Sequence, residues 1–192
     1  MKRTLLFALM IPLLLSGCGL RDSREVWQSL SSEVAESGSI SFTASVTTHD
    51  TDMPCTFRTA VVSSDGETVA TVTEPESIRG VRFRVDENGE ALEFDDAVLF
   101  LPGTREDADA PCVAPEVMLA SIRKGYLVCT GREGDVFTAT VSAPGGETVN
   151  LWYSEERVPL RAEILHDGVL TATLVVSGWK ADKLQNGQTD VR

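Results

Sequence analysis

The segment VRFRVDENGEALEF, residues 81–94, decides the fold class because it alternates apolar with charged side chains and then turns back on itself. Arg82 and Arg84 separate the first apolar positions, which predicts a strand with one buried face and one face in water. The Asn88-Gly89 pair that follows is a strong hairpin signal. The apolar positions on the two sides of this turn are Val81, Phe83, Val85, Leu92 and Phe94. The segment therefore predicts two antiparallel strands that share one apolar face.

The same period of two continues on both sides of this hairpin. Toward the N-terminus the alternating positions are Phe42, Ala44 and Val46, then Phe57, Thr59 and Val61, then Val69, Thr71 and Thr73. Toward the C-terminus the predicted strands are residues 98–101, 126–130, 136–141, 148–153, 158–165 and 169–179, with turn residues between most of them. Together these segments predict a mainly β (α+β) domain of about 11 antiparallel strands.

Two segments have the helical period instead. Asp22 and Glu25 have the spacing of a capping box, and apolar residues then recur at helical intervals as far as Gly38. These residues are Val26, Trp27, Leu30 and Val34. A second helix is predicted between Pro115 and Gly125, with apolar residues at Val117, Met118, Leu119 and Ile122. One helix therefore precedes the strands, and the other lies between the sixth and the seventh.

The first 17 residues have the organisation of a secretory signal, with Lys2 and Arg3, an apolar stretch, and small residues before Cys18. The apolar stretch is too short to span a bilayer, which takes about 20 residues. Residues 15–18, LSGC, resemble the bacterial lipobox, whose cysteine thiol receives a diacylglycerol. The sequence therefore predicts an exported protein, lipid-anchored through Cys18 to the cell membrane, or to the outer membrane if the host has one.

The charge excludes one class of partner. Removal of residues 1–17 takes away Lys2 and Arg3 and changes the formal charge from −12 to −14. A chain with this much negative charge does not attract nucleic acid or anionic lipid headgroups. We therefore expect membrane attachment to come from the lipid on Cys18. We expect a signal peptide over residues 1–17, a lipidated tether over 18–23, one domain over 24–180 and a loose polar tail over 181–192.

The order of elements resembles that of the LolA/LolB lipoprotein-carrier superfamily. Residues 72–83, VTEPESIRGVRF, resemble a passage of LolA-like lipoproteins of clostridial bacteria, and residues 92–96, LEFDD, are similar to the passage that usually follows it. The resemblance covers about residues 24–180. It implies a curved antiparallel half-barrel whose concave face is covered by the N-terminal helix and the second helix. A LolB-like protein would also project an apolar side chain from a loop after its early strands, and Ile78 is the nearest match.

The concave side of such a sheet has two alternative arrangements. It leaves an apolar cavity that suits an acyl chain, or the helices and strands interdigitate and fill it. The residues expected to line the cavity are Leu30, Phe42, Val46, Phe57, Val61, Val81, Phe83, Val85 and Met118. The sequence is compatible with both arrangements.

Motifs for enzyme chemistry are absent from the sequence. It contains no G-x-S-x-G elbow, no phosphate-binding glycine loop and no H-E-x-x-H. His49 and His166 are far apart and are expected in turns, and the acidic residues 106–109 and 155–156 are expected to be solvated loop charge rather than a metal site. We therefore expect no catalytic residues, no metal and no cofactor.

Cys55, Cys112 and Cys129 remain after Cys18, and none belongs to a C-x-x-C motif. Their odd number leaves three arrangements open: one disulfide within the chain and a free thiol, a disulfide between chains, or three reduced thiols. A free, buried thiol is as compatible with the sequence as a bridged one.

The resemblance implies a membrane-anchored lipoprotein that binds an apolar ligand, a lipid or a lipoprotein acyl chain, at the bacterial cell envelope. The alternative is a non-enzymatic interaction module that partners an envelope protein, namely a cell-wall enzyme such as an amidase, as in the GerS-like group of clostridial lipoproteins. An open apolar concavity favours the first function, and a filled core with an exposed apolar patch favours the second.

Overall fold

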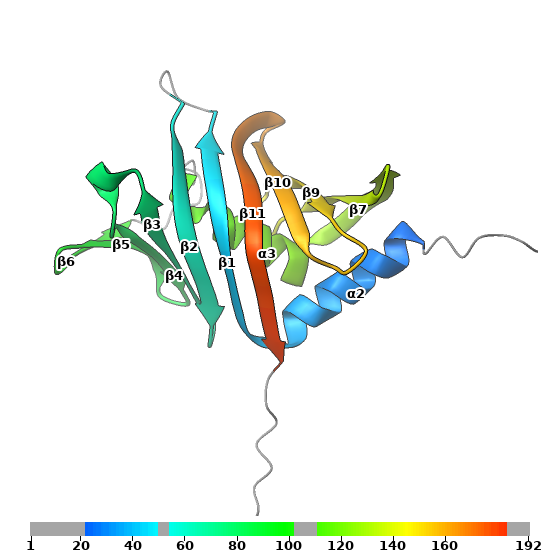
Figure 1. Ribbon diagram of the computed structural model, residues 1–192, viewed down its shortest axis with the longest axis horizontal. Helices are drawn as coiled ribbons and strands as arrows, with labels where there is room; N and C mark the ends of the chain where they lie inside the picture. The colour runs from blue at the N-terminus through cyan, green and yellow to red at the C-terminus, as the bar shows by residue number, and fades with distance from the viewer. Residues whose placement is uncertain (1–21, 50–53, 102–110, 184–192) are drawn as a thin grey trace, which may run out of the picture.

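The computed structural model describes residues 22–49, 54–101 and 111–183, which form one curved antiparallel sheet with helices on one side (Figure 1). Two α-helices lie in this part of the chain, α2 (Ser23–Glu36) and α3 (Ala114–Lys124), together with the 3-10 turns η1 (Glu76–Ile78) and η3 (Pro111–Val113). The strands are β1 (Ser37–Thr48), β2 (Thr56–Ser64), β3 (Glu67–Glu74), β4 (Arg82–Asp86), β5 (Gly89–Phe94), β6 (Ala97–Leu101), β7 (Tyr126–Glu133), β8 (Val136–Ser142), β9 (Thr148–Tyr153), β10 (Pro159–His166) and β11 (Val169–Lys183). The predicted half-barrel of about 11 strands is therefore confirmed.

The strands are arranged as two meanders joined along one seam. The order in the sheet is β6-β5-β4-β3-β2-β1-β11-β10-β9-β8-β7. Strands β1–β6 and β7–β11 each follow the chain, and the pairing of β1 with β11 joins them. Strands β6 and β7 are the two edges, and the sheet does not close. The order of strands follows from the hairpin turns, such as Asp65-Gly66, where both residues have positive φ, as the twist of a hairpin prefers.

Helix α2 forms as its sequence pattern predicts. The carboxylate of Asp22 accepts a hydrogen bond from the backbone N–H of Arg24, at 3.1 Å, and so caps the helix. The apolar residues Val26, Trp27, Leu30 and Val34 are buried. The helix ends at Glu36, before Gly38, and the chain enters β1 at Ser37 without a separate loop.

Helix α3 also forms where predicted, with η3 added before it. Gly125 ends the helix and its backbone N–H donates to the Ser121 carbonyl, at 3.0 Å. A side chain at position 125 would collide with Ser121 O and with Val141 on β8, so glycine is required by close approach. The side chains that α3 buries are Ala114, Pro115, Met118, Leu119, Ser121 and Ile122.

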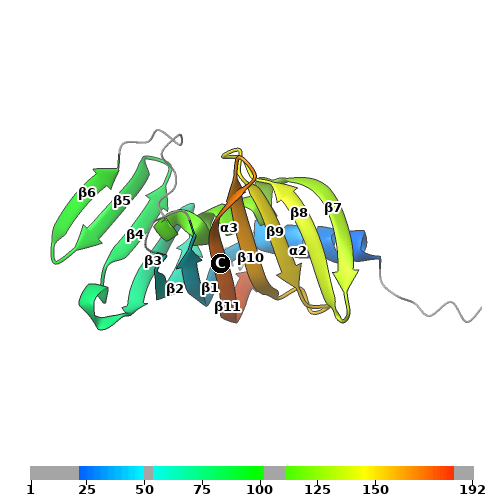
Figure 2. The same ribbon diagram turned by 90° about the horizontal axis from the view of Figure 1, so that it is seen from above.

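The helices cover only part of the concave side. Helix α2 packs against β1, β7, β8 and β11, and α3 packs against β8, β10 and β11, while η3 contacts β1 and β4. Figure 2 shows the sheet as an arc with both helices on one side and with β4–β6 extending beyond them. The part of the sheet farthest from the helices is therefore the β4–β6 end.

One sequence expectation needs correction at the level of residues. Strand β3 buries Thr68, Ala70 and Val72, so the predicted alternation of Val69, Thr71 and Thr73 has the opposite phase. The reason is the pairing of Val62 with Val69, which places both on the outer, convex face. The first described helix begins at Ser23 and the last described strand ends at Lys183. In the described part of the chain, no helix is long and apolar enough to span a membrane.

Candidate functional site

A row of apolar side chains crosses six strands on the concave face. In order of strand pairing it consists of Phe42, Val61, Ala70, Phe83, Leu92 and Leu99. Directly paired residues lie on the same face of a sheet, so these side chains form one continuous row. Its members come from β1 to β6, and the row begins under the helices and ends at the sheet edge.

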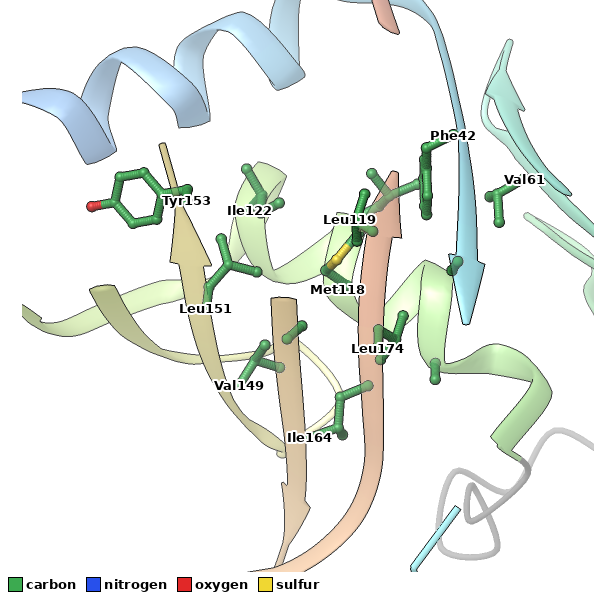
Figure 3. Close-up of a cluster of buried hydrophobic side chains, with 14 of the residues drawn as sticks. Phe42, Val61, Met118, Leu119, Ile122, Val149, Leu151, Tyr153, Ile164 and Leu174 are labelled. Atoms are coloured by element: carbon green, nitrogen blue, oxygen red, sulfur yellow. The ribbon is translucent and has the colours of Figure 1, made fainter. Parts of the chain in front are cut away.

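The helix-covered end of this row is packed. Leu30 of α2 and Met118 of α3 have no exposed surface, and Phe42 and Val61 are buried in the same core. Figure 3 shows Met118, Leu119 and Ile122 of α3 among side chains of the sheet, including Leu151 and Leu174. Between the helices and the central strands, therefore, the side chains interdigitate as in an ordinary protein core.

The residues predicted to line a cavity fall into two groups. Six of them belong to the buried core: Leu30, Phe42, Val46, Phe57, Val61 and Met118. Val81 and Phe83 are half-buried against that core, and Val85 lines a small separate cavity. The sequence therefore named core residues for the most part, and only the β4 residues reach the partly open end of the concave face.

The open end of the row has exposed apolar side chains. Phe83 and Leu92 are half-buried, Phe94 is 48% exposed and Leu99 is 60% exposed. The sequence analysis did not single out Leu99, because Val98, Leu99 and Phe100 are consecutive and apolar and carry no alternation. Only the pairing of Leu99 with Leu92 shows which of them lies on the concave face. The concave side of β4–β6 is therefore an apolar surface without a helix over it.

A buried polar cluster lies under α3 next to this surface. Thr68 donates to the Glu116 carboxylate at 2.5 Å and lies 2.8 Å from the Ser63 hydroxyl. The guanidinium of Arg123, also on α3, donates to the same Ser63 hydroxyl at 2.9 Å. These hydrogen bonds fix α3 over the β2–β3 hairpin. Sequence reasoning missed the cluster, whose only signal was Glu116 and Arg123 two helical turns apart on one face.

The three cysteines are free thiols in the structure. Cys55 and Cys129 are exposed, at the start of β2 and on the edge strand β7, whereas Cys112 is buried in η3. Burial raises the pKa of the Cys112 thiol to about 12, because the thiolate would lose its hydration. Burial likewise raises the pKa of Tyr153 to about 12. Cys18 lies outside the described residues.

The two histidines each lie close to a polar side chain. His49 Nε2 lies 2.9 Å from the Thr173 hydroxyl on β11, and His166 Nε2 lies 3.8 Å from the Asp167 carboxylate in the turn between β10 and β11. The hydroxyl of Ser154 lowers the pKa of Glu156, a fully exposed carboxylate. Residues 106–109 lie outside the described residues. Among the residues that the structure describes, no group of three histidine, cysteine, aspartate or glutamate side chains could hold a metal ion. Ile78 is 41% exposed on the loop between β3 and β4.

No family model matches the sequence, and no curated protein matches it. Among solved structures, the chain is similar to the LolA superfamily protein NE2245 from Nitrosomonas europaea, at 15% identity and a TM-score of 0.46, over 82% of this chain and 94% of that one. It is similar to an uncharacterized conserved protein from Thermus thermophilus, at 13% identity and a TM-score of 0.49, over 88% and 92% of the two chains. A third match, at 13% identity and a TM-score of 0.42 over 83% and 96%, is a chain in the structure of the CwlD amidase from Clostridioides difficile in complex with the GerS lipoprotein. All three of these structures are less than 25% identical to this chain.

Proposed function

We propose that this protein is a non-enzymatic envelope lipoprotein that binds an apolar ligand, a lipid or lipoprotein acyl chain, on the concave side of β4–β6. The observation that carries the proposal is the row from Phe42 to Leu99. It is packed under the helices on β1 and β2 and continues as an exposed apolar surface on β5 and β6. Contiguous exposed apolar surface of this kind is typical of binding sites.

The energetics of the open surface suit an acyl chain. From β3 to β6 the row covers three strand spacings, roughly 14 Å. Each methylene group that leaves water for this surface contributes about 0.8 kcal/mol if it is fully buried. A chain lying on one open face is only partly buried, so the ligand would need a covering element or a second contact for tight binding.

The start of α2 and the open surface lie at opposite ends of the sheet. The hydroxyl of Ser23, the first residue of α2, donates to Thr130 on β7, and its carbonyl accepts a hydrogen bond from Tyr153 on β9. Cys18 precedes Ser23 by five residues, a reach of at most roughly 18 Å. A lipid on Cys18 would therefore hold the β7 edge near the membrane and leave the β6 edge accessible to an incoming ligand.

A titration with an uncharged acyl probe tests the proposal. The chain produced from residue 18 with Cys18→Ala is titrated with a pyrene-labelled monoacylglycerol. We expect saturable binding that Leu99→Ser weakens by about 1–2 kcal/mol, or five- to thirtyfold. Val62→Ser is the matched control, because Val62 is 49% exposed on the opposite face of the same sheet. Absence of saturable binding, or equal loss in both variants, would overturn the proposal.

A second candidate, a protein-interaction module, is favoured by the outer face of β6. Val98 and Phe100 are 51% and 68% exposed, on the convex face, and β6 is an edge of the sheet. A cavity of about 240 Å³ beside Phe100 is lined by Arg84 and Asp86, which form an ion pair at 2.6 Å. An extended segment of a partner could pair with such an edge. Phe100→Ser would weaken this contact and leave acyl binding unchanged.

A further inference from the structure

Strand β6 is an edge of the sheet without the features that usually protect such an edge. Every residue from Phe94 to Phe100 is exposed, and the sequence of β6, AVLFL, carries no charge and no proline. Its pairing with β5 has no shift in register, so no bulge turns the strand away. An edge strand that lacks charge, proline and bulges is a template for pairing with another extended chain.

The opposite edge, β7, has several of these protective features (Figure 2). Its pairing with β8 shifts in register between Leu127 and Cys129, and the strand ends in the charged residues Arg132 and Glu133. Helix α2 also packs against β7. The two edges of the sheet therefore differ, and β6 is the one suited to accept a further strand.

Carboxylates lie at both ends of β6. Asp95 and Asp96 form the turn before the strand, and both have positive φ, as in a type I′ hairpin. At the other end, Glu90 is paired with Leu101, and Glu87 lies in the neighbouring turn between β4 and β5. Within residues 22–49, 54–101 and 111–183, none of these four carboxylates takes part in an ion pair.

The arginines of this region are paired with other carboxylates. Arg84 on β4 pairs with Asp86 at 2.6 Å and with Glu93 at 3.0 Å. Arg82 pairs with the same Glu93, at 3.4 Å. Residues 82–101 contain two arginines, no lysine and six acidic residues, so the formal charge of this segment is −4. An apolar edge with this charge around it favours a basic partner.

The same charge disfavours a second copy of this chain as the partner. If two β6 strands paired antiparallel, the start of one strand would lie beside the end of the other. The two aspartates of the turn in each copy would then approach Glu87 and Glu90 of the other copy. Like charges that face each other across paired strands are destabilising, so β6 is better suited to a different chain.

We infer that β6 pairs with an extended segment of another protein, in which apolar residues are flanked by basic ones. The backbone of this segment would bond to the outward N–H and C=O groups of β6, and its apolar side chains would contact Val98, Leu99 and Phe100. Its basic residues would lie beside the carboxylates at the two ends of β6, which five residues separate by roughly 13 Å. The inference rests on the second candidate function, whose partner chemistry it names, and does not depend on acyl binding.

Three seven-residue peptides with blocked ends test the inference. The first alternates valine and threonine between two terminal lysines, the second has glutamates in place of the lysines, and the third has the lysines but a central proline. Each is titrated calorimetrically into the chain produced from residue 18 with Cys18→Ala. We expect the lysine peptide to bind about tenfold or more tightly than the glutamate peptide. The proline peptide should lose most of the binding, because it lacks a backbone donor.

Matched aspartate variants separate the ends of β6 from the general acidity of the chain. Asp95→Asn combined with Asp96→Asn removes two charges and keeps the turn, because asparagine tolerates positive φ. This variant should reduce the preference for lysine over glutamate about fivefold. Asp65→Asn combined with Asp167→Asn is the control, because these aspartates also have positive φ but lie in other hairpin turns. The control should keep the full preference.

Each contrary outcome identifies what fails. If no peptide binds saturably, the inference and the second candidate function are both overturned. If the lysine and glutamate peptides bind equally well and Phe100→Ser weakens both, β6 remains an interaction edge but the basic partner is overturned. Equal effects of the two aspartate pairs would overturn it as well. Sedimentation of the chain alone tests the remaining occupant, because a dimer that Phe100→Ser dissociates would show that β6 pairs with a second copy.

Discussion

Leu92 pairs with Leu99 across β5 and β6, and this pair marks where the concave apolar face leaves the core and becomes open surface. On the other side of Leu92, Phe83 is half-buried and packs against the core. The same sheet therefore has a packed half under α2 and α3 and an apolar half without a helix over it.

The packed half should respond to truncation as a core does. Met118→Ala removes a side chain with no exposed surface from the centre of α3, so we expect a loss of about 2–5 kcal/mol in the free energy of unfolding. Leu99→Ala, at the exposed end of the row, should cost no more than about 0.5 kcal/mol. Urea denaturation of both variants measures the difference. A similar cost for both would show that the β6 end is as tightly packed as the helix-covered end.

The three thiols should differ in reactivity. The thiolate is the reactive form, and the pKa of Cys112 is raised to about 12, whereas Cys55 and Cys129 are exposed. With Cys18→Ala and Ellman's reagent at pH 8, we expect two fast equivalents and a third only after addition of denaturant. Three fast equivalents would contradict the burial of Cys112. Dimer formation through Cys55 or Cys129 under mild oxidation can be read on non-reducing gels of the single serine variants.

Alkaline pH should destabilise the fold partly through Tyr153. Its pKa is raised from about 10 in the unfolded chain to about 12, so the folded state favours the neutral phenol. This contribution is fully present below pH 10 and is lost as the pH rises toward 12, by up to about 2–3 kcal/mol. Tyr153→Phe should show a smaller loss across that window in urea unfolding at pH 9, 10 and 11. The raised pKa of Cys112 also lowers the free energy of unfolding as the pH rises, and it does so equally in the wild type and in Tyr153→Phe. Parallel pH profiles for the two proteins would contradict the assignment.

Replacement of Cys18, whose thiol would receive the lipid, tests the predicted anchor. Cys18→Ala should leave the protein unprocessed or release it from the membrane fraction, because the acyl chains supply the attachment. Fractionation and intact mass measure the outcome. If the Cys18→Ala variant still fractionates with the membrane and its mass still shows the same processing and modification, Cys18 is not the anchor.

The element order could be predicted because period and turn signals are local. Asp22, Gly89 and Gly125 mark a helix start, a hairpin and a helix end, and the structure agrees at all three. The phase of β3 was wrong because Val69 and Ala70 are both apolar enough for burial. The register of the β2–β3 hairpin decides which of the two residues is buried, because it pairs Ala70 with Val61. The sequence of β3 alone does not give this register.

The candidate site was predicted only in part, for the same reason. Phe83 and Val85 alternate with arginines, so their face could be read from the sequence. Leu99 stands in an apolar run without alternation, and only its pairing with Leu92 places it on the concave face. The partner of a residue in the next strand cannot be read from its own strand.

The most direct test of apolar ligand binding is photo-crosslinking in the native envelope. Benzoylphenylalanine is placed at position 99 on the concave face and, as the matched control, at position 62 on the convex face. The full chain is then irradiated in the cells that produce it. Mass spectrometry of the adducts should find lipid or an acyl chain attached at position 99 and none at position 62. Adducts at position 99 that consist only of protein, or equal lipid labelling at both positions, would contradict the account.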